Sequence, residues 1–145
     1  MKKVWIIEDN EDHALLIRRG IESADCAVLH YPDGMKALEA SQKIQDEGSR
    51  PELIFLDLKL PGMDGFEVIQ KLKEIKLFKR IPVVILTTSS RREEIEKAYQ
   101  LGAGGFVSKS EDFEDLTAKL KRVKDYWLYT VEPPDPTPIK KQVVR

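Results

Sequence analysis

Short runs of apolar residues alternate with longer, more polar segments along most of the chain. Five of these runs have the length of a β-strand, and three of the five are almost continuously apolar. Such runs are typical of strands that helices cover on both faces of a parallel sheet. The five runs are residues 4–7, 27–31, 53–56, 83–86 and 105–107.

The segments between the runs repeat apolar residues every three or four positions, as one face of a helix requires. Residues that favour helix N-caps precede four of these segments, and a glycine stands where the fourth helix should end. The expected caps are Asn10, Asp33, Asp64 and Ser90, and the glycine is Gly102. Alternating strands and helices predict an α/β class of fold, a doubly wound (βα)5 domain with a parallel five-stranded sheet.

This domain should occupy residues 1–130. Residues 131–145 follow as a C-terminal extension with four of the chain's eight prolines. Such a segment predicts no helix and favours polyproline II. It is too short for a separate output domain that would bind DNA or catalyse a reaction.

Composition excludes several classes of protein. The chain has 145 residues and a net charge of −1, which gives no electrostatic reason to bind nucleic acid or an anionic membrane. No apolar run approaches the roughly 20 residues of a membrane span, and the N-terminus has too few apolar residues for a signal peptide. The single cysteine, Cys26, excludes an internal disulfide and is expected to be a small buried residue. We therefore expect a cytoplasmic protein.

Reactive side chains stand where the predicted strands end. Glu8 and Asp9 follow the first run, Asp57 the third, Thr87 the fourth and Lys109 the fifth. Functional crevices of open α/β sheets lie at the carboxyl ends of the strands, so these side chains should gather at one edge. The neighbouring Thr88 competes with Thr87 for the end of its strand.

The chemistry of this set is specific. Three carboxylates at one edge repel each other unless a cation lies among them, and oxygen ligands of this kind suit Mg²⁺. A metal would keep Asp57 ionised, while a lysine and a hydroxyl opposite would bind the oxygens of an incoming anion. Together these groups indicate phosphoryl transfer onto an aspartate.

Four motifs carry a resemblance to a known family: IIEDN, LIFLDLKLPGMDG, IPVVILTTS and GAGGFVSK, in this order. Over residues 2–128 the chain resembles the receiver domain of bacterial two-component response regulators. The resemblance implies a flavodoxin-like strand order 2-1-3-4-5, Mg²⁺ as cofactor and a sensor histidine kinase as partner. It implies a switch that assists its own phosphorylation and dephosphorylation but is not a stand-alone enzyme.

The resemblance also implies a role for individual residues of the site. Asp57 would be the phosphoacceptor; Glu8, Asp9, Asp57 and the backbone carbonyl of Lys59 would hold Mg²⁺; Thr87 would be the switch hydroxyl, Lys109 the phosphate-binding lysine and Phe106 the switch aromatic. From the residues alone, Phe106 is equally well a core ring. Asp64 is expected to be a helix cap rather than a metal ligand, and His13 and His30 to be surface or packing residues.

Two features depart from the family or extend beyond it. The family usually has proline after the conserved lysine, in a cis peptide, whereas Ser110 follows Lys109 here. The stretch DYWLYTVEPP resembles the extension of single-domain regulators that serve bacterial phytochromes. Tyr126, Leu128 and Tyr129 lie off the apolar stripe of the last helix, so we expect them to be exposed. They predict a homodimer through this helix and the extension, with output by contact with a downstream protein.

Other functions remain open from the sequence. The chain would also suit a phosphotransfer intermediate or phosphate sink in a relay, or a scaffold that works without phosphorylation. A haloacid-dehalogenase-type phosphatase needs a second aspartate two residues after its nucleophile, and Lys59 stands there. A flavin or nucleotide module needs a loop rich in Gly, Ser or Thr after the first strand, whereas EDNEDH would repel phosphate.

Overall fold

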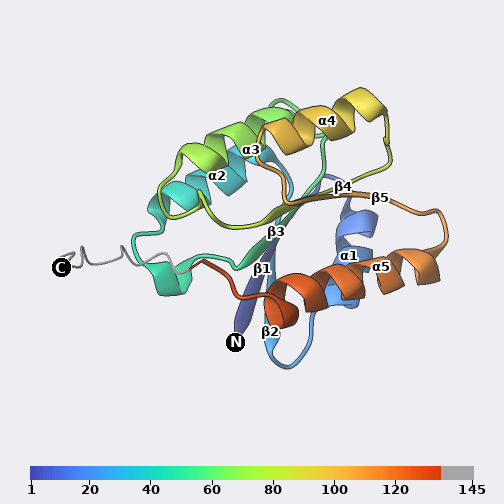
Figure 1. Ribbon diagram of the computed structural model, residues 1–145, viewed down its shortest axis with the longest axis horizontal. Coiled ribbons are helices and arrows are strands. Elements are labelled where there is room, and N and C mark those ends of the chain that lie inside the picture. The colour runs from blue at the N-terminus through green and yellow to red at the C-terminus, as the bar shows by residue number, and fades with distance from the viewer. Residues whose placement is uncertain (135–145) are drawn as a thin grey trace, which may run out of the picture.

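The computed structural model describes residues 1–134, which form a parallel sheet between two layers of helices (Figure 1). The strands are β1 (Lys2–Ile7), β2 (Cys26–Tyr31), β3 (Leu53–Leu56), β4 (Val83–Thr87) and β5 (Gly105–Ser108). Their order in the sheet is β2-β1-β3-β4-β5 and every pairing is parallel. The predicted fold class and the strand order 2-1-3-4-5 are confirmed.

Five α-helices connect and flank the strands. They are α1 (Glu11–Ile21), α2 (Gly34–Lys43), α3 (Gly65–Glu74), α4 (Arg92–Gln100) and α5 (Phe113–Asp125). A short 3₁₀ helix, η1 (Glu47–Ser49), precedes β3, and a π-helical turn, η2 (Tyr126–Thr130), continues α5. Helices α2, α3 and α4 cover one face of the sheet, and α1 and α5 cover the other (Figure 1).

The core has two halves because successive strand residues point to opposite faces of the sheet. In β1, Val4 and Ile6 pack with the α1 and α5 layer, whereas Trp5 and Ile7 pack with the α2–α4 layer. Cys26 is fully buried in the first of these halves, as expected. Burial on both faces explains why the central strands are continuously apolar in sequence.

Helix caps follow the sequence pattern at three of the four expected places. The side chains of Asn10, Asp33 and Asp64 accept hydrogen bonds from the first turns of α1, α2 and α3. The prediction for Ser90 is wrong. Arg91 occupies the cap of α4 and its side chain makes no capping hydrogen bond. Gly102, with φ of 103°, follows the end of α4 as predicted.

The turn η2 places one residue differently from its prediction. Leu128 is only 6% exposed and packs in the α1 and α5 half of the core, so its predicted exposure is wrong. The wider π-helical turn changes the angular spacing along the chain and brings Leu128 onto the buried face. Tyr126 and Tyr129 are 50% and 47% exposed, as expected.

The proposed C-terminal extension lies mostly outside the described residues. Residues 131–134 contain neither helix nor strand, and residues 135–145 lie beyond the described range. Among the residues that are described, no helix is long and apolar enough to cross a membrane.

Candidate functional site

The site is built by strand ends that the sheet register brings together. The backbone N–H of Asp57 donates to the carbonyl of Ile7 at 3.0 Å, which places the end of β3 beside the end of β1. The N–H of Lys109 donates to the carbonyl of Thr87 at 2.7 Å, which aligns the ends of β5 and β4. These bonds gather at one edge the five side chains that the sequence singles out.

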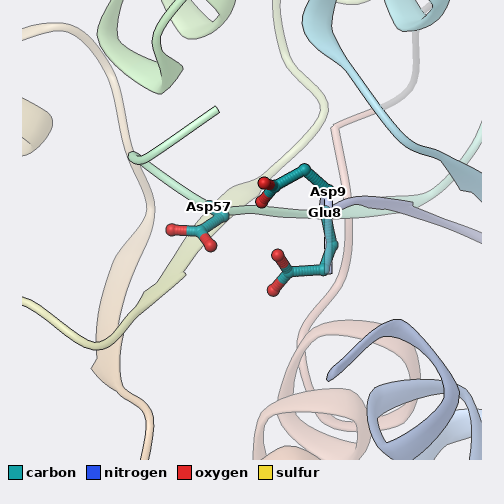
Figure 2. A group of neighbouring side chains, drawn as sticks. All are labelled: Glu8, Asp9 and Asp57. Atoms are coloured by element: carbon teal, nitrogen blue, oxygen red, sulfur yellow. The ribbon is translucent and has the colours of Figure 1, made fainter. Parts of the chain in front are cut away.

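Three carboxylates meet at this edge (Figure 2). Glu8, Asp9 and Asp57 each offer an oxygen, and these oxygens lie within 4.8 Å of one another. Glu8 and Asp57 are buried, whereas Asp9 is exposed, so the group opens to solvent on one side. Oxygen donors at this separation, with room for water, match what a hard divalent cation such as Mg²⁺ requires.

The pKa of Glu8 also favours a bound cation at this site. Burial raises the pKa of Glu8 to about 7, although the Lys109 ammonium acts in the opposite direction. The backbone N–H of Asn10 donates to its carboxylate at 3.2 Å. A cation among the three carboxylates would supply the positive charge that keeps this buried group ionised.

Lys109 reaches the carboxylates from β5. Its ammonium donates to Asp57 Oδ2 at 3.1 Å and also to Glu8 Oε1, and its side chain is only 5% exposed. Burial acts to raise the pKa of Asp57, but the Lys109 charge and the N–H of Lys59, which donates to Oδ1 at 3.1 Å, outweigh it. The pKa of Asp57 therefore lies below its ordinary value, and its carboxylate is ionised and partly shielded at neutral pH.

Thr87, rather than Thr88, is the last residue of β4. Its side chain is fully buried, whereas Thr88 is exposed. The Thr87 hydroxyl is near enough to Asp57 to help lower the pKa of that carboxyl, yet it completes no hydrogen bond within residues 1–134. A buried hydroxyl without a partner costs free energy, and an oxyanion bound beside Asp57 would supply the missing acceptor.

Comparison with known proteins agrees with this geometry. The family model described as "Response regulator receiver domain" matches residues 4–121. The chain belongs to the response regulator receiver domain family. Receiver domains are signalling switches that bind a divalent metal and work with sensor histidine kinases.

Individual relatives are similar to this receiver domain over nearly its whole length. A probable methanogenesis regulatory protein, FilR2, from Methanothrix harundinacea is 35% identical, over 92% of this chain and 88% of its own. Response regulator Rcp1 from a Synechocystis strain is 32% identical, over 92% and 93%. The phosphorylated cyanobacterial phytochrome response regulator RcpA matches with 34% identity and a TM-score of 0.85, over 92% of this chain and 99% of its own. Rcp1 has also been solved in an Mn²⁺-bound form, which matches with a TM-score of 0.82.

The loop after β3 packs closely against the Asp57 backbone of this receiver domain. The N–H of Gly65 donates to the carbonyl of Leu58 at 2.9 Å, which folds the loop back on the end of the strand. A Cβ atom at Gly65 would lie 2.4 Å from the Asp57 carbonyl oxygen, so only glycine fits this close approach. The predicted role of the Lys59 carbonyl as a metal ligand stays a prediction.

The structure also describes Phe106 and the peptide bond that follows Lys109. Phe106 is half-buried and packs against the α2–α4 half of the core, and it is one of the residues around a cavity between β5 and α5. Its role as a switch stays a prediction. The described residues contain no cis peptide bond, so the Lys109–Ser110 peptide of this receiver domain is trans.

The sequence reasoning missed the contribution of the two histidines. His13 Nδ1 lies 3.0 Å from Lys109 Nζ, and His30 Nε2 lies 2.6 Å from the carbonyl oxygen of Glu8. Burial and the Lys109 charge lower the pKa of His13. One feature of the sequence could have indicated His13. It follows Asp9 by four residues and lies in the first turn of the predicted helix, where side chains point toward the helix N-terminus and so toward the strand ends.

Proposed function

We propose that this receiver domain is a phosphorylation-activated switch in which Asp57 accepts a phosphoryl group from a sensor histidine kinase. One observation carries the proposal: the buried Asp57 carboxylate lies 3.1 Å from the Lys109 ammonium, within a cluster of three carboxylates. A carboxylate needed only for structure would not require two more acids at the same edge.

The chemistry follows from the placement of the side chains. A carboxylate oxygen of Asp57 attacks the phosphorus of the donor phosphohistidine, the P–N bond breaks, and a mixed anhydride forms on Asp57. Lys109 and the Thr87 hydroxyl donate to the transferred phosphoryl oxygens. Glu8, Asp9, Asp57 and the Lys59 carbonyl would hold Mg²⁺, which neutralises charge on the phosphoryl oxygens when it is bound.

The domain assists its own phosphorylation and dephosphorylation rather than acting as a stand-alone enzyme. Alternative functions in the same class are a phosphotransfer intermediate or phosphate sink in a multistep relay. A scaffold that works without phosphorylation is a further alternative, and it would need neither the ionised Asp57 nor the acidic cluster beside it.

Similarity to phytochrome response regulators supports a phytochrome as the kinase partner. Output would occur by protein contact, with a downstream target or with a second copy of the chain bound through α5 and the C-terminal extension. The expected cytoplasmic location stays a prediction.

Incubation with Mg²⁺ and acetyl phosphate, followed by intact-mass measurement, tests the proposal. The unmodified chain should gain one phosphoryl group, which chelator prevents and which is acid-stable and base-labile. Asp57→Asn should gain none while its circular dichroism spectrum is unchanged, because the amide is not a nucleophile. Undiminished phosphate on Asp57→Asn would refute the assignment.

A further inference from the structure

The Lys109 ammonium has three partners, one for each of its donor protons. Glu8 and Asp57 accept two hydrogen bonds and His13 Nδ1, at 3.0 Å, accepts the third. An ammonium can only donate, so the His13 ring must be neutral, with its proton on Nε2. The lowered pKa of His13 likewise favours the neutral ring.

We propose that His13 is a positioning residue for phosphoryl transfer, because its imidazole holds the Lys109 ammonium toward Asp57. The inference rests on the proposed function of the site. His13 touches neither the nucleophilic oxygen nor the expected phosphoryl group; it acts through Lys109.

Glu8 has two roles in the site, and this is why Lys109 needs a further hydrogen-bond acceptor. Glu8 belongs to the acidic cluster that suits a divalent cation, and it is also an acceptor for Lys109. A bound cation would draw the Glu8 and Asp57 oxygens toward itself and weaken their bonds to the ammonium. Nδ1 of His13 would then be the neutral acceptor that keeps Lys109 in place, since Mg²⁺ prefers oxygen ligands and leaves the imidazole free.

The position of His13 is itself well fixed. Its backbone N–H donates to the Asn10 cap at 3.0 Å, and the next residue of α1, Ala14, is buried. The capping bond fixes the first turn of α1, to which His13 belongs. A tether on the Lys109 head group is also valuable in this chain, because Ser110 follows the lysine where the family usually has proline.

Substitution at His13 separates an acceptor role from a packing role. His13→Ala removes the acceptor, whereas His13→Asn keeps a carbonyl oxygen close to the place of Nδ1. The matched control is Leu15→Ala, an exposed change on the same helix in a side chain that is 47% exposed. All variants are full-length chains, measured at pH 8, where an imidazole of ordinary pKa is neutral.

Two quantities are measured for each variant. The first is the rate of phosphorylation by acetyl phosphate with Mg²⁺, and the second is the dissociation constant for beryllofluoride, a phosphoryl mimic that needs no chemical step. We expect His13→Ala to lower the rate and weaken beryllofluoride binding by at least about tenfold each, the effect of one lost hydrogen bond to a charged group. His13→Asn should restore both to within about twofold, and Leu15→Ala should change neither. The Mg²⁺ dissociation constant, measured by calorimetry, should be the same in all variants.

Each other outcome overturns the inference. Equal values for His13→Ala and the unmodified chain show that Lys109 needs no tether. Equal losses in the Ala and Asn variants show that His13 acts by packing, and a changed Mg²⁺ constant shows that it acts on the metal. If the unmodified chain gains no phosphate at all, the proposed function fails instead.

Discussion

Thr87 is the residue of the site whose buried polar group is not hydrogen-bonded within the described residues. Its hydroxyl is buried and lacks a hydrogen-bond partner within the described residues, whereas the neighbouring side chains of Asp57 and Lys109 are paired with each other. Burial of an unpaired hydroxyl is unfavourable by about 1–3 kcal/mol. An oxyanion bound beside Asp57 would give this hydroxyl an acceptor.

This predicts opposite effects of Thr87→Val on stability and on binding. Valine keeps the shape and removes the hydroxyl, so the free energy of unfolding without ligand should hold or rise by about 1 kcal/mol. Beryllofluoride binding should weaken at the same time. Denaturant titration and fluorescence measure the two quantities, with the exposed Thr88→Val as control. A loss of 1 kcal/mol or more in Thr87→Val would show that the hydroxyl is already satisfied in the fold.

The site residues that could be predicted from the sequence are those at the ends of strands, because the strand ends themselves could be predicted. Asp57 and Glu8 follow an apolar run directly and Asp9 and Lys109 follow one a residue later, and parallel strands bring such positions together. His13 was missed because it lies in the first turn of α1 rather than at the end of a strand, so the rule that located the other residues does not reach it.

At the scale of elements, α4 differs from the other helices near the site. Helices α1, α2 and α3 begin with an Asn or Asp cap, whereas α4 begins at Arg91 without a capping bond. Ala98 is the single residue of α4 that is buried. The helix therefore has less burial and capping to stabilise it than α1, α2 and α3, although Ser89 donates a hydrogen bond to Glu94 in its first turn.

A cap should stabilise this helix measurably. Arg91 has the extended backbone conformation of a cap residue, with φ of −66° and ψ of 139°. Arg91→Asp should accept a hydrogen bond from the first turn and raise the free energy of unfolding by about 1 kcal/mol. Arg91→Ala, which removes the same positive charge but offers no acceptor, should give at most a few tenths of that. Equal gains from both changes, in urea titrations, would assign the effect to charge alone.

Element boundaries were predicted to within two residues for the strands because their apolar runs have sharp ends. The π-helical turn Tyr126–Thr130 was not predictable. An i→i+5 turn has no distinctive residue pattern, so the spacing of an α-helix was carried on to Leu128 and gave the wrong face.

At the scale of the whole molecule, the doubly wound class followed from alternation of strands and helices. The strand order followed only from the resemblance, since the spacing of elements does not fix which strands are neighbours. The exposed aromatic side chains at the end of α5 bear on assembly. Tyr129 donates to Asp25 of its own chain at 2.7 Å, whereas Tyr126 contacts the edge of Trp127 and is half exposed.

The homodimer proposal therefore depends most on Tyr126. Tyr126→Ala should weaken dimerisation at least tenfold, because a central aromatic residue commonly contributes 2 kcal/mol or more to an interface. Analytical ultracentrifugation with and without beryllofluoride measures it. Leu128→Ala serves as a contrast: Leu128 is buried, so this change should lower the free energy of unfolding by about 2–5 kcal/mol. A monomeric unmodified chain in both states would refute the proposal.

The central claim is that Asp57 is the phosphoacceptor, and the position of the phosphoryl group tests it most directly. The unmodified chain is phosphorylated with Mg²⁺ and acetyl phosphate and then reduced with borohydride, which converts a phosphorylated aspartate to homoserine. Peptide mass spectrometry then locates the reduced residue. We expect homoserine at position 57 alone. Reduction at Glu8 or Asp9, or phosphate without any reduced residue at position 57, would contradict the account.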